Sequence, residues 1–296
     1  MEFLGRDNLH RLSHQMRSYL GGLTLKQLDV GTQRYRYLDS GPAHHKETIL
    51  FLHGLSGNKT QWRSLMNIFS GKYRVIAFDV PGLCTSLKTA SDQYDFKTLA
   101  NEVDAFVNAL ALEDFHLFGH SLGASVGVVY AGRNGHKLSS LTLCSVVAID
   151  NSVTEDGLGL TPFAEFKKLM MFNTVEDFSR LSDRLFYAPP KAPDAVLKYS
   201  MKEVLKQRQF YVQLLSDLND SAQLVQRALP FIDCPCLVLK GSDDYFFSPR
   251  SEALLNRRVK NLTFRTLDCC GHIPHLEKPR DLSALYGLFL NSVNVD

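Results

Sequence analysis

The sequence predicts an α/β protein with a mostly parallel central sheet flanked by helices. Strand-like and helix-like segments alternate along most of the chain, a pattern typical of this architecture. The alternation fails between residues 150 and 231, where only helical patterns occur, so we expect a helical insertion between two strands of the sheet. The length of 296 residues suits one large domain that carries such an insertion.

The predicted elements follow one another in a regular order. Residues 23–30 and 33–38 flank Gly31-Thr32 and predict an opening antiparallel hairpin. Further strands are predicted at residues 48–52, 74–80, 115–118, 138–147, 236–240 and 262–267. Helices are predicted at residues 61–69, 96–110, 124–131 and 282–290 from apolar residues at helical spacing. The predicted domains are an N-terminal segment (1–22), a sheet domain (23–149 and 232–296) and the helical insertion (150–231).

Composition and charge argue against several classes of function. Charged residues make up 22% of the chain, and the net charge of +2 is too small to favour nucleic acid as a partner. No stretch reaches the roughly 18 apolar residues of a membrane-spanning helix. The N-terminus lacks the basic start and apolar core of a secretory signal, so we expect a cytoplasmic protein. The six cysteines follow neither a disulfide framework nor the spacing of a zinc site, and we expect free thiols, no metal and no organic cofactor.

A G-x-S-x-G motif provides a candidate nucleophile. The motif spans residues 119–123 (GHSLG), after the predicted strand 115–118 and before the predicted helix 124–131. It requires a sharp strand-to-helix turn that exposes the serine above the sheet, and its glycines avoid collisions with neighbouring backbone. The sequence therefore predicts Ser121 as the nucleophile.

A serine nucleophile needs a base, and histidine titrates in the useful range. His272 lies on a short loop after the predicted strand 262–267, which fits the chain order serine, acid, histidine. His275, three residues later, is the alternative base.

The acid is expected at the end of a strand between the serine and the histidine. Asp243 and Asp244 follow the predicted strand 236–240, and Asp150 follows the predicted strand 138–147. We favour Asp244, although the spacing alone leaves the other two open.

Five motifs in this order resemble the α/β-hydrolase fold family over most of the chain. They are His53-Gly54, the D-x-P-G turn at residues 79–82, the elbow at 119–123, the G-x-x-D turn at 241–244 and the terminal Gly271-His272. The resemblance implies an α/β-hydrolase fold, Asp244 as the acid, and an oxyanion hole formed by the backbone N–H groups of Leu55 and Leu122. It also implies that the insertion forms a cap over the active site. Cys84 departs from the pattern, because the family commonly has glycine there.

Residues 53–59 (HGLSGNK), followed by Trp62, are similar to monoacylglycerol-lipase-type carboxylesterases. The resemblance implies a hydrolase that cleaves a lipid-like or small acyl ester through an acyl-enzyme, with a small-molecule ester as its partner. The family's dehalogenases and epoxide hydrolases place aspartate at the elbow, so Ser121 argues against both. A C–C bond or thioester hydrolase is the enzymatic alternative, and a ligand sensor with little turnover is the alternative from another class.

Two further segments carry apolar residues at helical spacing. In the insertion, such residues either pack the cap against the sheet domain or line an acyl pocket. They are Phe163, Phe166, Leu169, Met170, Met171, Phe172, Phe178 and Leu181. In the N-terminal segment, one helix face is expected to hold Leu9, Leu12, Met16, Tyr19 and Leu20. This helix either docks on its own domain or makes a peripheral contact with a membrane surface.

Overall fold

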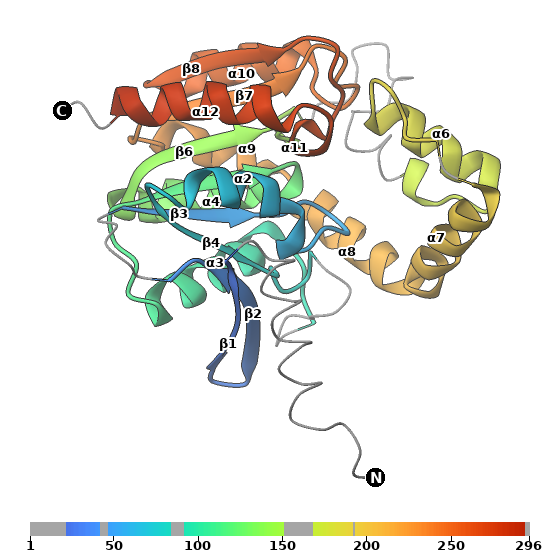
Figure 1. The fold of residues 1–296 in the computed structure, drawn as a ribbon, viewed down its shortest axis with the longest axis horizontal. Coiled ribbons are helices and arrows are strands. Elements are labelled where there is room, and N and C mark those ends of the chain that lie inside the picture. The colour runs from blue at the N-terminus through green and yellow to red at the C-terminus, as the bar shows by residue number, and fades with distance from the viewer. Residues whose placement is uncertain (1–21, 42–46, 84–91, 151–167, 192, 294–296) are drawn as a thin grey trace.

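An eight-stranded sheet forms the centre of the computed structural model, with the strand order β1-β2-β4-β3-β5-β6-β7-β8 (Figure 1). The structure describes residues 22–41, 47–83, 92–150, 168–191 and 193–293. β1 and β2 form an antiparallel hairpin, β2 joins β4 in the antiparallel sense, and the strands from β3 to β8 run parallel. The predicted mostly parallel sheet is therefore confirmed.

The elements have the following bounds. The strands are β1 (Thr24–Val30), β2 (Gln33–Asp39), β3 (Thr48–Leu52), β4 (Arg74–Phe78), β5 (Phe115–His120), β6 (Leu138–Cys144), β7 (Cys236–Gly241) and β8 (Leu262–Leu267). The α-helices are α2 (Arg63–Phe69), α3 (Phe96–Ala109), α4 (Leu122–Asn134), α6 (Val175–Leu185), α7 (Asp194–Lys206), α8 (Arg208–Ser221), α9 (Gln223–Ala228), α10 (Pro249–Arg258), α11 (Pro274–Glu277) and α12 (Pro279–Val293). Short 3-10 turns are η1 (Lys59–Trp62), η2 (Gly135–Lys137) and η3 (Leu229–Phe231).

Some predicted boundaries differ from those in the structure. β4 ends at Phe78, and Val80 instead donates its N–H to the ring of His53 at 3.0 Å. β6 ends at Cys144 because Ser145 takes a φ of 50°, which a strand does not allow. α12 begins earlier than predicted, at a proline, and proline is favoured in the first turn of a helix.

Helices cover both faces of the sheet. α3, α4 and α9 pack together on one face, and α2 and α12 pack on the other (Figure 1). Alternate residues of β3 therefore enter different cores: Leu50 and Leu52 pack with the first group, and Ile49 and Phe51 pack with the second. Burial on both faces is typical of parallel strands.

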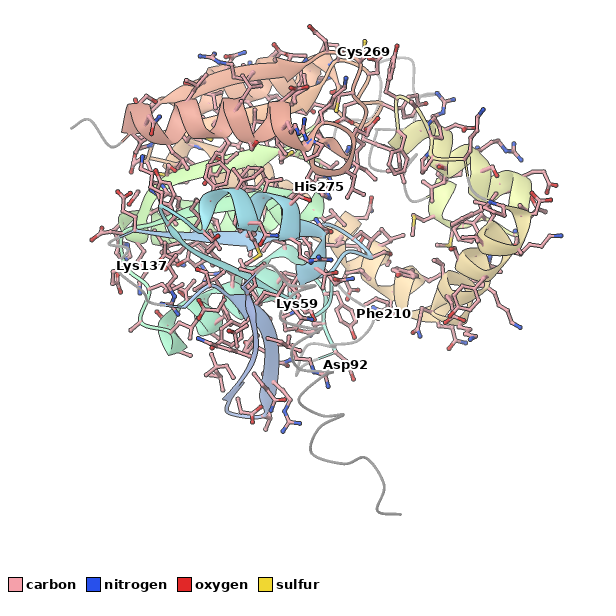
Figure 2. All side chains as sticks on the ribbon, in the orientation of Figure 1. Lys59, Asp92, Lys137, Phe210, Cys269 and His275 are labelled. Atoms are coloured by element: carbon pink, nitrogen blue, oxygen red, sulfur yellow. The ribbon has the colours of Figure 1, made fainter. Side chains whose placement is uncertain are left out.

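Between β6 and β7, the described residues form only helices and irregular segments. α6 and α7 stand away from the sheet, and α8 returns the chain to it (Figure 1). α6 begins with a capping box in which the Thr174 hydroxyl accepts the N–H of Asp177. None of the 13 residues of α7 is buried. Cys269 lies at the upper edge of the molecule in the view of Figure 2, and Lys137 lies at the end farthest from α6 and α7. The domain boundaries stay predictions.

Several predictions fall on residues outside the described ranges. They concern the apolar face of the N-terminal segment, Cys84, Phe163 and Phe166. Of the helices that the structure does describe, none has the length and apolar character needed to cross a membrane.

Candidate active site

The G-x-S-x-G motif forms a sharp turn between β5 and α4. Ser121 takes a φ of 53° and a ψ of −123°, a conformation that costs energy for any residue other than glycine. A Cβ on Gly119 would lie 2.5 Å from the Cα of Ala124, and a Cβ on Gly123 would collide with the carbonyl oxygen of His53. The two glycines therefore permit the tight turn that holds the Ser121 hydroxyl at the carboxyl edge of the sheet.

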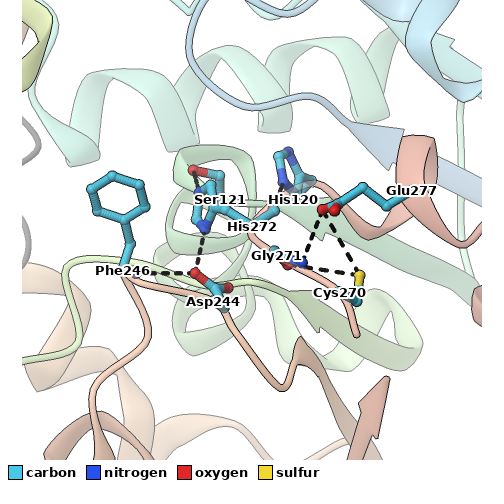
Figure 3. Close-up of polar contacts among 8 residues, drawn as sticks. All are labelled: His120, Ser121, Asp244, Phe246, Cys270, Gly271, His272 and Glu277. Atoms are coloured by element: carbon cyan, nitrogen blue, oxygen red, sulfur yellow. Dashed lines mark hydrogen bonds and ion pairs between the residues drawn. The ribbon is translucent and has the colours of Figure 1, made fainter. Parts of the chain in front are cut away.

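Three polar side chains from different strand ends meet at this turn (Figure 3). His272 lies on the loop after β8 (residues 268–273, here called the histidine loop), with Nε2 2.9 Å from Oγ of Ser121. Its Nδ1 lies 2.8 Å from Oδ1 of Asp244, which follows β7. Because a carboxylate only accepts, Nδ1 carries the proton and Nε2 is free to accept the serine proton. This arrangement activates a hydroxyl as a nucleophile.

The Asp244 carboxylate is held in its charged form beside His272. Burial alone raises the pKa of Asp244, but the electrostatic attraction and ring hydrogen bond of His272, together with the Phe246 N–H at 3.1 Å, leave that pKa below its usual value. The Phe246 ring also packs against the His272 ring, with 5.0 Å between their centroids. A charged carboxylate in this position fixes both the tautomer and the orientation of the imidazole.

The two alternative acids lie elsewhere. Asp243 is exposed and accepts a hydrogen bond from the Ser242 hydroxyl at 2.6 Å. Asp150 lies 3.5 Å from the guanidinium of Arg250. Of the three candidates, Asp244 is the one that the structure brings to the imidazole.

The alternative base, His275, is buried between two other rings. Its ring centroid lies 4.9 Å from that of Trp62 and 4.6 Å from that of His120. Burial lowers the pKa of His275 well below its usual value and that of His120 to about 3, so both rings are neutral. His120 donates from Nε2 to the backbone carbonyl of His272 at 2.8 Å, a contact that the sequence analysis missed.

The two backbone N–H groups predicted to form an oxyanion hole belong to residues near Ser121. Leu122 follows Ser121 and is the first residue of α4. Leu55 follows Gly54, which lies so close to Ser121 that a Cβ added to this glycine would be 3.0 Å from the Cβ of Ser121. Neither N–H has a hydrogen-bond acceptor within the part of the chain that the structure describes. N–H groups at the start of a helix also carry the positive end of its dipole, which favours an anion.

The loop after β3 is fixed by a network that the sequence showed only as separate motifs. The His53 ring donates from Nδ1 to the Gly54 carbonyl at 2.8 Å and accepts the Val80 N–H at Nε2. Burial lowers the pKa of His53, so the ring stays neutral and keeps its acceptor nitrogen. An ion pair of 2.6 Å joins Nζ of Lys59 to Oδ2 of Asp79. The H-G and D-x-P-G motifs thus support each other.

A pocket of about 180 Å³ opens beside Ser121. Leu55, Ser56 and Ile273 line it on the side of the sheet domain. The insertion contributes Met170, Phe172, Phe178, Leu181, Leu185 and Val204. Its described lining residues include no Asp, Glu, Lys or Arg, and their only ring nitrogens are those of His120 and His272. The pocket therefore suits an uncharged apolar group.

No metal site occurs among the described residues. Across the described ranges, no group of three or more His, Cys, Asp or Glu side chains could hold a metal ion. The cysteines with described positions are free thiols: Cys144, Cys234, Cys236, Cys269 and Cys270.

The chain is similar to a known protein family and to several lipases. The family model described as alpha/beta hydrolase fold matches residues 47–279. A monoacylglycerol lipase of Xenopus laevis, abhd6-A, is 25% identical over 284 residues, which cover 92% of this chain and 83% of that protein. Lipase 3 of Moraxella sp. is 24% identical over 82% of this chain and 77% of its own length.

Solved structures agree with this assignment. A putative lipase from Acinetobacter baumannii is 28% identical, with a TM-score of 0.78 over 96% of each chain. A bacterial membrane phospholipase A shares the fold, with a TM-score of 0.83 at 24% identity over 99% of this chain and 94% of its own. The chain therefore belongs to the α/β-hydrolase fold family.

Proposed function

We propose that the protein is a serine hydrolase that cleaves a carboxylic ester with an apolar acyl chain. The observation that carries this proposal is the chain of hydrogen bonds from Ser121 through His272 to Asp244, together with the apolar pocket beside Ser121. The lipases among its relatives support the same reaction class.

The reaction proceeds by acyl transfer through the serine. Oγ of Ser121 attacks the ester carbonyl while Nε2 of His272 takes its proton, and Asp244 stabilises the imidazolium that forms. The tetrahedral intermediate collapses to an acyl-enzyme as the imidazolium gives its proton to the leaving alcohol. Water, activated by the same imidazole, then attacks the acyl-enzyme and releases the carboxylic acid.

The oxyanion hole is assigned to the N–H groups of Leu55 and Leu122. In this proposal their unused donors stabilise charge that develops only on the carbonyl oxygen of the intermediate. One such donor is worth about 3 kcal/mol on the barrier.

The pocket lining favours an ester over the substrate of a C–C hydrolase. The 2-hydroxy-6-oxo-6-phenylhexa-2,4-dienoate hydrolase of Rhodococcus, a structural neighbour at 16% identity and a TM-score of 0.76, acts on a carboxylate. A buried carboxylate needs a cationic partner, and the described pocket lining offers no lysine or arginine. An uncharged fatty acyl ester, such as a monoacylglycerol, fits this lining better.

In this proposal the insertion acts as a cap whose apolar side chains hold the acyl chain. Met170, Phe178 and Leu181 face the pocket from the cap side. The peripheral membrane contact of residues 1–22 is a separate proposal that rests on the apolar face of that segment in the sequence.

The test combines a covalent probe with a substrate series. A fluorophosphonate should label the wild-type protein at Ser121 and should not label Ser121→Ala. Purified protein should hydrolyse p-nitrophenyl butyrate, p-nitrophenyl octanoate and monooleoylglycerol, and should leave the phenylhexadienoate intact. Labelling without turnover of any ester would favour the ligand sensor, and labelling that survives Ser121→Ala would refute the assigned nucleophile.

A further inference from the structure

The chain leaves α6 alongside the histidine loop. Leu185 is the last residue of α6, and its carbonyl accepts the backbone N–H of His272 at 2.7 Å. Glu277, at the end of α11, uses both carboxylate oxygens. Oε1 accepts the Gly271 N–H at 2.9 Å (Figure 3), and Oε2 accepts the Tyr187 N–H at 2.8 Å. One carboxylate therefore joins the histidine loop to the insertion.

The two segments are packed closely against each other. A Cβ on Gly271 would lie 2.7 Å from both the Leu185 carbonyl oxygen and the backbone nitrogen of Tyr187. On its other side, the loop meets β7, because a Cβ on Gly241 would collide with the carbonyl oxygen of Cys270. The histidine loop is thus enclosed between the end of β7 and the exit from α6, and such close packing transmits displacement.

Two further contacts strengthen this junction. The thiol of Cys270 lies 4.0 Å from Oε1 of Glu277. Burial, followed by the charge of that carboxylate, raises the pKa of Cys270 to about 12, so the thiol keeps the proton that it can donate. On the acid side, the guanidinium of Arg184 in α6 lies 4.0 Å from the ring centroid of Tyr245, which follows Asp244 in the chain.

The other end of the insertion is fastened at a different place. In α8, Tyr211 accepts a hydrogen bond from the Ser56 hydroxyl at 2.6 Å, and Asp217 accepts the Tyr94 N–H at 3.0 Å. Between these anchors, α7 has no buried residue. A movement of α6 away from the sheet would therefore separate the junction with the histidine loop while the α8 contacts stay in place.

We propose that Glu277 is a positioning residue that couples the cap to the catalytic base. When α6 is docked, the Glu277 carboxylate accepts the N–H of Gly271 and the Leu185 carbonyl accepts the N–H of His272. When α6 moves to admit substrate, the histidine loop loses this support, and efficient chemistry requires α6 to dock again. This inference rests on the proposed function, because that function makes His272 the base.

The test removes one hydrogen bond of the junction at a time. Tyr187→Pro deletes the N–H that Glu277 accepts, and the preceding Phe186 already has a φ of −117° and a ψ of 143°, the region that proline requires of its predecessor. Tyr187→Ala keeps this N–H and is the matched control. Glu277→Gln keeps one acceptor oxygen but turns an NH2 group toward the other N–H. Its control is Glu113→Gln, which breaks a 2.9 Å ion pair with Lys137 at the opposite end of the molecule (Figure 2).

We expect Tyr187→Pro and Glu277→Gln each to lower kcat for p-nitrophenyl butyrate by about ten- to a hundredfold. KM should change by less than about threefold, because misplacing a catalytic group acts on the transition state. The double variant should lose little more than either single variant, since both remove the same junction. The two control variants should keep the wild-type kcat. Wild-type kcat in both Tyr187→Pro and Glu277→Gln would overturn the proposal, and should one of them fail to fold, the other decides.

A second readout does not depend on turnover. The hydrogen bond from Nδ1 of His272 to Asp244 should give a low-field proton resonance in the wild-type protein. That resonance should broaden or vanish in Tyr187→Pro and Glu277→Gln at an unchanged melting temperature, and should persist in both controls. An unchanged resonance would count against the coupling as strongly as unchanged kcat. A resonance that responds as expected in a protein that cleaves no ester would instead refute the proposed function and leave the coupling standing.

Discussion

The sheet and the helices inserted between β6 and β7 bury their side chains to very different extents. Every residue of β5 is buried, and its aromatic side chains pack on both faces of the sheet. In α6 only Leu181 is buried, and α7 has no buried residue at all. The sheet thus forms a dense framework, whereas α6 and α7 present a thin apolar face toward the active site.

In the proposed function, this difference separates the residues of the chemical step from the residues that select a substrate. Ser121, Asp244 and His272 all follow strands of the framework, where backbone position is tightly fixed. Most of the apolar pocket lining comes from the insertion, where one side of a helix faces the pocket and the other faces solvent. Substitutions at strand ends should therefore change the rate of the chemical step, and substitutions of the pocket-lining side chains in the insertion should change the choice of acyl chain.

The largest effect is expected at the acid. Asp244→Asn leaves the serine and the oxyanion hole in place but lets the imidazole adopt the wrong tautomer, so kcat should fall by up to about 10⁴-fold. Asp243→Asn and Asp150→Asn should each stay within about tenfold of wild type, because neither carboxylate contacts the imidazole. Turnover of p-nitrophenyl butyrate by the three folded variants measures this directly. A severe loss in Asp150→Asn would move the acid to the end of β6.

The next effect concerns stability. Phe118 in β5 is fully buried among the rings of Phe51, Trp62 and Tyr286, so Phe118→Ala should lower the free energy of unfolding by about 3–5 kcal/mol. Tyr199 in α7 is 66% exposed, and Tyr199→Ala should change the free energy of unfolding by less than about 0.5 kcal/mol. Urea unfolding of both variants provides the comparison. Equal losses would mean that α7 is held as firmly as the sheet.

Acid should destabilise the sheet domain in particular. Burial lowers the pKa of His116 to about 4 and that of His120 to about 3, whereas both titrate near 6.5 in an unfolded chain. Below about pH 6.5 the unfolded state binds protons that the folded state does not. Stability is then lost at about 1.4 kcal/mol per pH unit for each histidine, until the folded pKa is reached. Residues 150–231 contain no histidine, so they add nothing to this loss.

Urea unfolding at pH 7.5, 6.5 and 5.5 measures the slope. In His116→Gln the free energy of unfolding should fall less steeply with pH, because one fewer proton is taken up on unfolding. His136 is exposed, and His136→Gln should keep the wild-type slope. A slope unaffected by His116→Gln would show that this ring is not the neutral buried group described above.

Sequence reasoning succeeded where the information is local. The hairpin, the alternating strands and the elbow at residues 119–123 are each set by a few neighbouring residues, and the fold was predicted from them. The choice among three aspartates was not local, since it depends on which carboxylate a turn directs toward the imidazole. Strand ends were also misjudged, as at Ser145, where a positive φ leaves no mark in the residue type.

Contacts between distant segments could not be predicted at all. The ion pair of Lys59 with Asp79 and the hydrogen bond of Glu277 with the Tyr187 N–H join residues that become neighbours only when the sheet is assembled. Both contacts join segments near the carboxyl edge of the sheet, where parallel strands bring remote motifs together. A single sequence identifies the motifs at this edge but not how they support one another.

The smallest expected effect tests the other half of the comparison, the insertion. Phe178 in α6 lines the pocket and packs edge-on against Phe172, with 5.0 Å between ring centroids. We expect a long acyl chain to contact this ring more than a two-carbon acyl group does, so Phe178→Ala should affect the longer ester more. The control is Phe210→Ala in α8, whose ring packs on Tyr94 at 5.3 Å and does not line the pocket.

If the cap selects the acyl chain, Phe178→Ala should lower the ratio of kcat/KM for p-nitrophenyl octanoate to that for p-nitrophenyl acetate by about tenfold. This equals about 1.4 kcal/mol, the scale of one or two buried methylene contacts. The acetate value itself should stay near wild type, because the strand-end residues that perform the chemistry are untouched. Phe210→Ala should leave the ratio unchanged. An equal fall for both esters in Phe178→Ala would mean that this pocket side chain acts on the chemical step and not on the choice of acyl chain.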